Sequence, residues 1–342
     1  MVDPKKESET CDRTANTQAF LRICMDPALL IGTHAAVTAA LKAGLFRVLY
    51  SGPQSAAECA EKLGLNRRAT ECVLDVLVSS GFASQKGSLY QLTGPLRDLG
   101  LPAVEGSLQV FAQHFDHTMN LLKTGAPLAF MDDSREQREA SYSGIVGGMG
   151  KEFRSAAHTL ATKLSFQPSR IIDVGCGSGV WSLAVASLYP DAQVIGLDFP
   201  KVLEVFEGRA QASGLEKQIK KLPGDMYTVE LPAEPIDLVI IANVLRLEAP
   251  EKARALVARF AAALRPGGRL LIVDAFAGGT LEKELQRTVY ALYLALRTSV
   301  GRVYAPAEVK EWMRAAGVSE PVEIDLGSHL GAIGALLSER PG

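Results

Sequence analysis

The residues best suited to chemistry are the glycines of a loop that follows a run of buried-strand type. That run ends near Asp173 and leads directly into Gly175, Gly177 and Gly179. An amphipathic helix is expected immediately after them, over about 180–188. Alternate glycines let a backbone turn sharply and approach a ligand closely, and a helix N-terminus offers free N–H groups and a positive dipole end. The loop predicts a site for a nucleotide-like ligand, a property that many glycine-rich strand-to-helix loops share.

Two acidic residues follow the loop at places where a nucleoside can be held. Asp198 ends the next predicted strand, directly before Phe199, and a carboxylate there can accept hydrogen bonds from both hydroxyls of an adenosine ribose. Asp225 and Met226 follow a possible third strand and suit the amino group and the ring face of adenine. The spacing also fits NAD, but Ser182 stands where a dinucleotide loop would carry its third glycine. The order of these residues therefore favours S-adenosylmethionine, with a dehydrogenase as an alternative.

Composition and charge narrow the class of protein. Of 342 residues, 47% are hydrophobic and 22% are charged, and the net charge is −2. These values predict a soluble globular protein without the basic field of a nucleic-acid binder. The five cysteines form no CxxC pair and have no histidine at metal-ligand spacing, so we expect free thiols and no metal. With no signal-like or membrane-length apolar run, we expect a cytoplasmic protein without a membrane partner.

The periodicity of apolar residues divides the chain into three regions. Residues 12–98 are expected to form helix, short helix, longer helix and hairpin, the order found in a winged helix-turn-helix. Residues 99–165 are helical and amphipathic, with a glycine-rich break. Residues 166–342 alternate strands with amphipathic helices, which is typical of a parallel α/β sheet.

Local signals predict the elements of the first region. One helix is expected over 35–50, ending before Ser51-Gly52-Pro53. Ser55 and Glu58 have the spacing of a capping box at the start of the short helix, and Asn66 can cap the longer helix. The run 82–93 indicates a hairpin that turns at Lys86-Gly87.

The last region has apolar runs of strand length with helical stretches between them. The expected strands are 170–174, 193–198, 236–242 and 269–274, with two more possible at 321–326 and 332–338.

Four motifs, taken together and in this order, resemble the small-molecule O-methyltransferases of the acetylserotonin and caffeate type. They are Ile172–Gly179, Gly196–Asp198, Gly224–Met226 and Leu264–Asp274. The resemblance covers roughly residues 15–338. It implies an α/β fold in which a Rossmann-like class I methyltransferase domain, with a mostly parallel seven-stranded sheet, follows an α-rich winged-helix dimerisation domain.

The resemblance also implies a homodimer with interlocked N-terminal helices and S-adenosylmethionine as the cofactor. It places the acceptor between the middle helices and the sheet, above the cofactor. Met149 stands where members of the family usually have a methionine near the cofactor, and Asn243 is counted with the cofactor-binding residues.

The chain departs from the family at the position of the catalytic base. Members usually carry a histidine in a segment like Asn-x-Leu-His, and this histidine removes the proton of the accepting hydroxyl. The matching segment here is 243–248, and the histidine position holds Arg246. An arginine stays protonated at neutral pH, so it cannot act as a general base.

Three interpretations of this departure stay open. Arg246 can stabilise an acceptor that is already anionic by charge-assisted hydrogen bonds. Alternatively, His114 and His117, three residues apart on one helix face, can line the cavity and one of them can supply the base. In the third interpretation, Arg246 makes a structural pair with Glu248 or Asp274.

The sequence therefore predicts an S-adenosylmethionine-dependent methyltransferase acting on a small aromatic or polyketide-like acceptor, with O-methylation favoured. The alternatives are a C-methyltransferase and a cofactor-dependent enzyme of the same fold that transfers no methyl group. A DNA-binding regulator is an alternative of another class. It is disfavoured because Arg67 and Arg68 are the only basic residues at the start of the expected recognition helix.

Overall fold

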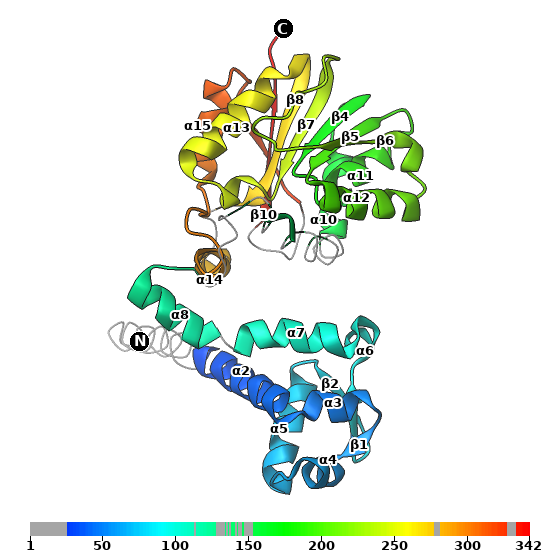
Figure 1. Cartoon of the computed structure of the whole chain (residues 1–342), viewed down its shortest axis with the longest axis vertical. Helices are drawn as coiled ribbons and strands as arrows, with labels where there is room; N and C mark the ends of the chain where they lie inside the picture. The colour runs from blue at the N-terminus through cyan, green and yellow to red at the C-terminus, as the bar shows by residue number, and fades with distance from the viewer. Residues whose placement is uncertain are drawn as a thin grey trace, which may run out of the picture. The chain divides into compact units, whose positions relative to one another are not determined.

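The structure is a computed structural model that describes residues 26–112, 114–127, 134, 136, 138–140, 142, 146, 153–276, 281–326 and 333–342. The chain divides into two compact units, Met1–Met119 and Asn120–Gly342, which are coloured from blue to cyan and from green to red (Figure 1). Each unit has its own hydrophobic core.

The first unit is mostly helical and contains one small antiparallel sheet. Its helices are α2 Asp26–Ala43, α3 Leu45–Tyr50, α4 Ala56–Leu63, α5 Arg67–Ser79, α6 Gly94–Leu99 and α7 Leu101–Ala112. Helix α8, His114–Thr124, spans the division between the units. The sheet has the order β1-β3-β2, with β1 Gln54–Ser55, β2 Ala83–Lys86 and β3 Leu89–Leu92.

The predicted caps of this unit are confirmed, but the predicted single helix over 35–50 is wrong. Ser55 and Glu58 form the full capping box of α4, and the Asn66 side chain accepts from the backbone N–H of Ala69 at the start of α5. The helix that was expected over 35–50 begins earlier, at Asp26, and breaks at Gly44. Gly44 has φ of 84°, a left-handed conformation that glycine adopts without the steric penalty of a Cβ.

The second unit is built on a seven-stranded sheet with the order β6-β5-β4-β7-β8-β10-β9. Its strands are β4 Arg170–Val174, β5 Gln193–Asp198, β6 Ile219–Pro223, β7 Ile236–Ala242, β8 Leu264–Ala275, β9 Val322–Ile324 and β10 Ile333–Glu339. The first five pair in parallel, and β10 runs antiparallel to both of its neighbours. The predicted α/β fold with a mostly parallel seven-stranded sheet is confirmed.

Helices cover both faces of this sheet. Helices α10 Arg154–Lys163, α11 Val180–Ala186 and α12 Pro200–Ala212 pack on one face, and α13 Pro250–Ala262 and α15 Pro306–Ala315 pack on the other. The remaining elements are η2 Glu216–Gln218, η3 Leu245–Leu247 and α14 Leu281–Ala295. Because both faces are covered, side chains on both faces of the central strands are buried, and the consecutive residues Ile171 and Ile172 of β4 are both fully buried.

The strand order creates a crevice at one edge of the sheet. From β4 the chain moves outward through β5 to β6, and it then returns to place β7 on the other side of β4. Ligands of open α/β sheets bind at such a reversal, outside the carboxyl ends of the strands. The glycine loop follows β4 at this point, and Asp198 ends the neighbouring β5.

None of the helices described is long and apolar enough to span a membrane. Within the same residues, no three His, Cys, Asp or Glu side chains come together in a group that could hold a metal ion.

Candidate functional site

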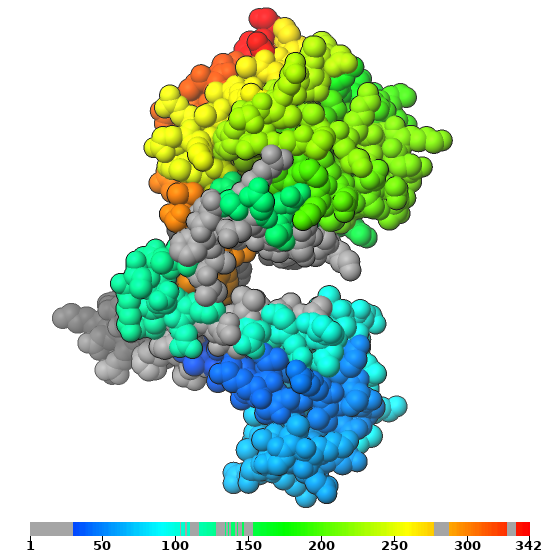
Figure 2. Space-filling model, viewed as in Figure 1, coloured from blue at the N-terminus to red at the C-terminus, as the bar shows by residue number. Residues whose placement is uncertain are grey.

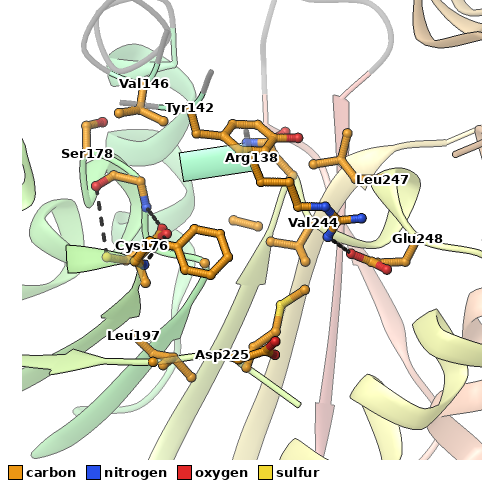
Figure 3. Close-up of a pocket in the computed structure, with 18 of the residues that line it drawn as sticks. Arg138, Tyr142, Val146, Cys176, Ser178, Leu197, Asp225, Val244, Leu247 and Glu248 are labelled. Carbon is orange, nitrogen blue, oxygen red and sulfur yellow. Dashed lines mark hydrogen bonds and ion pairs between the residues drawn. The ribbon is translucent and has the colours of Figure 1, made fainter. Parts of the chain in front are cut away.

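A cavity of about 400 Å³ opens at the carboxyl ends of β4, β5 and β7. Figure 3 shows Cys176 and Ser178 of the glycine loop on one side of it and Arg138 and Glu248 on the opposite side, with Asp225 between them. Seven of the predicted cofactor-binding residues line this cavity, namely Gly175, Gly177, Asp198, Phe199, Asp225, Met226 and Asn243. Of the other three, Asp173 and Gly179 lie in the same strand and loop without lining it, and Met149 falls outside the described residues.

The glycine loop has the conformation that its sequence predicts. Gly175, Gly177 and Gly179 all have positive φ, at 63°, 55° and 70°. A Cβ on Gly175 would come within 2.8 Å of the Val244 side chain, and one on Gly179 would overlap the ring of Phe206. The loop therefore requires glycine both for its dihedral angles and for its close packing.

Asp198 is held in place by the loop that it faces. Its two carboxylate oxygens accept the backbone N–H groups of Gly177 at 2.9 Å and of Phe199 at 2.8 Å. Burial raises the pKa of Asp198 to about 6, and these two hydrogen bonds oppose the rise. Each carboxylate oxygen can accept further hydrogen bonds, so Asp198 can receive a pair of ligand hydroxyls at the cavity wall.

Asp173 lies beneath the loop and has a different environment. Its side chain is buried and accepts the hydroxyl of Ser182 at 2.5 Å. Burial raises the pKa of Asp173 to about 7 against this hydrogen bond. Ser182, at the position where a dinucleotide loop would carry a third glycine, thus ties helix α11 to the end of β4. A contact between Asp173 and a cofactor stays a prediction.

Asp225 shapes the turn after β6. One of its carboxylate oxygens accepts the backbone N–H of Tyr227 at 2.8 Å, and its carbonyl oxygen accepts the N–H groups of Thr228 and Val229. Asp225, Met226 and Tyr227 all line the cavity. The turn therefore presents an acidic, an apolar and an aromatic side chain to one end of it.

The Arg246 side chain is buried, and its guanidinium group is hydrogen-bonded to two neighbouring side chains. Its side chain is 4% exposed, and its Nη1 donates to Asp274 Oδ1 at 2.7 Å and to Asn243 Oδ1 at 2.6 Å. Burial, the largest single influence, would lower the pKa of Arg246, but the charge and hydrogen bond of Asp274 together with Tyr290 and Tyr142 raise it overall. The guanidinium therefore stays charged. Its guanidinium carbon lies 5.3 Å from the centre of the Tyr290 ring. The structure thus contains the structural pair between Arg246 and Asp274 that the third interpretation of the sequence considered. Arg246 is not among the described residues that line the cavity.

The histidines considered as bases lie on α8. This helix begins at His114, whose side chain is outside the described residues, and His117 on its next turn is half-buried. Their participation in catalysis stays a prediction.

Several residues of the cavity wall were not predicted from the sequence, among them Arg138, Tyr142 and Glu248. Arg138 and Tyr142 belong to the segment 134–146, whose described residues lie on the surface of the second unit (Figure 2). Arg138 Nη1 pairs with Glu248 Oε1 at 2.8 Å, and Glu139 beside it accepts the backbone N–H of Lys201. Glu248 was considered only as a partner of Arg246, although its own partner is Arg138. The alternating basic and acidic residues of 134–139 were the one sequence feature that could have indicated a site here. The same pattern is common on exposed helices, so it did not distinguish this segment.

Tyr142 adds a neutral hydroxyl to the wall. Burial raises the pKa of Tyr142 to about 12, although the positive charges of Arg138, Arg246 and Arg297 oppose the rise. A phenol with this pKa stays protonated at neutral pH, so it can donate a hydrogen bond but is a poor proton acceptor.

Comparison with known proteins identifies the family. The model of the O-methyltransferase domain family matches residues 122–319, more than half of the chain. The tetracenomycin polyketide synthesis 8-O-methyl transferase of Streptomyces glaucescens is 25% identical over 300 residues, covering 83% of this chain and 87% of that protein. The L-tyrosine C(3)-methyltransferase of Streptomyces lavendulae is 30% identical over 150 residues, covering 44% of this chain and 41% of that one.

Among solved structures, human N-acetylserotonin methyltransferase in complex with S-adenosylmethionine has the same fold. It superposes with a TM-score of 0.71 at 21% identity, covering 95% of this chain and 98% of the human chain. The family match covers residues 122–319, and the glycine loop and Asp198 line the cavity. The chain therefore belongs to the O-methyltransferase family and is an S-adenosylmethionine-dependent methyltransferase.

Proposed function

We propose that this enzyme transfers the methyl group of S-adenosylmethionine to an oxygen of a small aromatic or polyketide-like acceptor. The observation that carries the proposal is the cavity, which is lined at once by the glycine loop, by the carboxylate of Asp198 and by the turn at Asp225. The family match and the relative that methylates a polyketide oxygen support the choice of acceptor.

The polar groups of the cavity fit this cofactor. Asp198 would accept the ribose hydroxyls, and Asp225 with Met226 would hold the purine. Buried polar atoms without a partner in the described structure also belong to cavity-lining residues, among them Trp181 Nε1 and Glu248 Oε2. Such atoms are rare in proteins and are satisfied by a ligand or by water. When bound, the cofactor supplies an activated methyl group on a sulfonium.

The residues of this chain would contribute mainly by positioning. Alignment of two reactants in one site can contribute roughly 7–11 kcal/mol to lowering a barrier in favourable cases. Because Arg246 is paired with Asp274, it is not a proton acceptor, and Tyr142 is held in its neutral form. We therefore infer an acceptor whose hydroxyl ionises readily, such as a phenol or an enol beside a carbonyl group, and whose proton passes to water.

Methylation at carbon is the second candidate. It is favoured by Arg246 in the histidine position and by the similarity to the L-tyrosine C(3)-methyltransferase of Streptomyces lavendulae. Incubation with methyl-labelled S-adenosylmethionine and a panel of phenols and enols, followed by mass spectrometry and NMR of the product, separates the two. A methoxy signal supports O-methylation, and a methyl signal on carbon supports the alternative. Absence of labelled product from every acceptor of both classes contradicts the proposal.

We also propose the domain organisation that the family resemblance implies. Residues 12–98 would form the winged-helix dimerisation domain, 99–165 the region that covers the acceptor, and 166–342 the cofactor-binding domain. Sedimentation equilibrium is expected to give a homodimer. A gel shift with random duplex DNA at low salt is expected to show no firm, salt-sensitive binding, and such binding would favour the regulator.

Cofactor affinity is expected to depend on pH through Asp198. The ribose hydroxyls bind the ionised carboxylate better, and the pKa of Asp198 is about 6 in the free protein. Affinity is therefore complete above this pKa and decreases as the pH falls through it, approaching about tenfold per pH unit below it. Calorimetric titration with S-adenosylhomocysteine between about pH 7.5 and pH 5 measures this slope. The Asp198→Asn variant should bind weakly with no such slope, and an equal slope in both proteins would exclude Asp198 as its source.

A further inference from the structure

The orientation of the Asn243 side chain is fixed by its partner. Asn243 follows β7 directly and lines the cavity, and its Oδ1 accepts Nη1 of Arg246 at 2.6 Å. The guanidinium of Arg246 carries only donors, so it must be met by the amide oxygen of Asn243 and not by the NH₂ group. Among the described residues, the NH₂ group of Asn243 has no hydrogen-bond partner. Asn243 therefore keeps an unused donor at the cavity wall.

The backbone of Asn243 is held in an unusual conformation. Its φ of 62° is the only positive value among the non-glycine residues that the structure describes. Such a conformation is costly for a residue with a Cβ, although asparagine adopts it more readily than most, and it is concentrated at functional sites. The backbone N–H of Asn243 donates to the carbonyl oxygen of Val273 on β8 at 2.7 Å. The sheet thus holds this residue in place at the end of β7.

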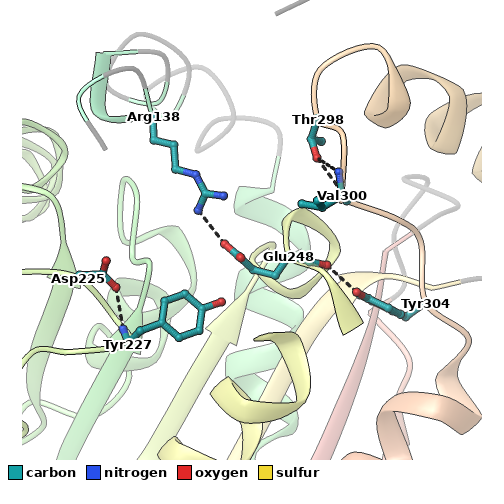
Figure 4. Close-up of polar contacts among 8 residues, drawn as sticks. Arg138, Asp225, Tyr227, Glu248, Thr298, Val300 and Tyr304 are labelled. Carbon is teal, nitrogen blue, oxygen red and sulfur yellow. Dashed lines mark hydrogen bonds and ion pairs between the residues drawn. The ribbon is translucent and has the colours of Figure 1, made fainter. Parts of the chain in front are cut away.

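The turn η3, which carries Arg246, is fixed by the segment that follows α14. The hydroxyl of Tyr304 donates to the carbonyl oxygen of Glu248 at 2.6 Å (Figure 4). A Cβ on Gly301 would come within 2.6 Å of the carbonyl oxygen of Arg246, so the two backbones are in close contact. Together with the ion pair to Asp274, these contacts leave Arg246 and the amide that it holds little freedom to move.

The strand order places Asn243 near the reacting end of the proposed cofactor. Its purine is proposed to bind at Asp225, after β6, and its ribose at Asp198, after β5. The sheet continues in the order β6-β5-β4-β7, so the sulfur, which lies beyond the ribose, would be above β4 and would face the end of β7. Asn243, which the sequence grouped with the cofactor-binding residues, would then meet the acceptor.

We propose that the NH₂ group of Asn243 donates a hydrogen bond to the acceptor oxygen and stabilises its ionised form, and that Arg246 is the positioning residue that orients this amide. Arg246 thereby acts on the reaction without lining the cavity. The acceptor hydroxyl loses its proton to water, its oxygen bonds to the methyl carbon, and the electron pair of the broken carbon–sulfur bond stays on sulfur. Donors that are fixed in advance stabilise an oxyanion without reorganisation. The inference rests on the proposed function and names the residue that holds the acceptor.

Two substitutions of Asn243 test the role of the amide. Asn243→Gly removes it and keeps a residue that adopts positive φ without strain, whereas Asn243→Asp keeps Oδ1 for Arg246 and replaces the donor with an acceptor. The probe is 4-nitrophenol, whose ionised form absorbs visible light, added to the complex of the protein with S-adenosylhomocysteine. We expect the pKa of the bound phenol to be at least about one pH unit lower in the wild type than in Asn243→Gly, and highest in Asn243→Asp. The charged groups at the cavity wall are the same in wild type and Asn243→Gly, namely Arg138, Asp198, Asp225, Glu248 and Lys252.

A triple variant tests whether Arg246 acts through Asn243. Adding Arg246→Ala and Asp274→Asn to Asn243→Gly removes one positive and one negative charge together, so the net charge of the site is unchanged. If Arg246 only orients the amide, the pKa of the bound phenol is the same in the triple variant as in Asn243→Gly. A further rise would mean that Arg246 acts on the acceptor directly, which overturns its assignment as a positioning residue.

The matched control is Asn66→Gly, the same change at the N-cap of α5, where glycine is tolerated, and it should keep the wild-type pKa of the bound phenol. Equal pKa values in wild type, Asn243→Gly and Asn243→Asp overturn the inference, as does a wild-type complex that does not bind 4-nitrophenol. A loss of more than about threefold in affinity for S-adenosylhomocysteine in a folded Asn243→Gly would place the amide against the cofactor and also overturn it. In each case, methylation of other phenols by the wild type would leave the proposed function standing.

Discussion

Replacing Asp198 with alanine is expected to reduce the affinity for S-adenosylhomocysteine by about 100-fold or more. Two hydrogen bonds from the ribose to a carboxylate would be lost, and hydrogen bonds to charged groups contribute about 1.5–3 kcal/mol each. The carboxylate also accepts the N–H groups of Gly177 and Phe199, so its removal leaves the loop less well oriented. Isothermal titration calorimetry measures the loss directly.

The control for this prediction is a carboxylate in the same sheet but away from the cavity. Asp237, on β7, accepts the backbone N–H groups of Ser169 and Arg170, as Asp198 accepts those of its loop. Asp237→Ala should affect the stability of the fold and leave cofactor affinity within about threefold of wild type, because Asp237 is not among the lining residues. Unchanged affinity in Asp198→Ala would mean that the ribose is held elsewhere.

Replacing Arg246 with alanine is expected to destabilise the second unit by about 3 kcal/mol. The change leaves Asp274, which is 2% exposed, without its charged partner, and an uncompensated buried charge is costly. Affinity for S-adenosylhomocysteine should change little, because Arg246 does not line the described cavity. Urea unfolding measures the free energy of unfolding. Calorimetric titration, at a temperature where the variant is folded, measures the affinity for S-adenosylhomocysteine.

The structural role of Arg246 can be separated from a role in turnover. Adding Asp274→Asn to Arg246→Ala removes the unpaired charge and should restore part of the lost stability. Arg254→Ala, at an exposed position of α13, should change stability by no more than about 0.5 kcal/mol. If Arg246→Ala keeps wild-type stability and loses turnover, Arg246 faces the acceptor and the pair with Asp274 does not describe the working enzyme.

The parts of this protein that follow from the sequence are those with local causes. The capping box at Ser55, the cap at Asn66 and the left-handed glycines of the loop each depend on a few neighbouring residues, and each is found where it was predicted. The break at Gly44 was missed because the apolar pattern continues through it, although glycine in a left-handed conformation ends a helix.

The parts of the site that could not be predicted depend on contacts between distant segments. Arg138 and Glu248 are separated by 110 residues, and nothing near either of them indicates the other. For Arg246 the sequence left two partners open, Glu248 nearby and Asp274 on β8, and the structure shows the pair with Asp274, 28 residues away. Both carboxylates were possible partners of Arg246 from the sequence. The pairing of β7 with β8 brings Asp274 to Arg246.

A crystal structure of the protein with S-adenosylhomocysteine bound tests the central claim most directly. The expected result is the ligand in the cavity at the carboxyl ends of β4, β5 and β7, with both ribose hydroxyls within hydrogen-bond distance of Asp198 and the purine beside Met226. A ligand bound outside this cavity, or a ribose with no contact to Asp198, would contradict it.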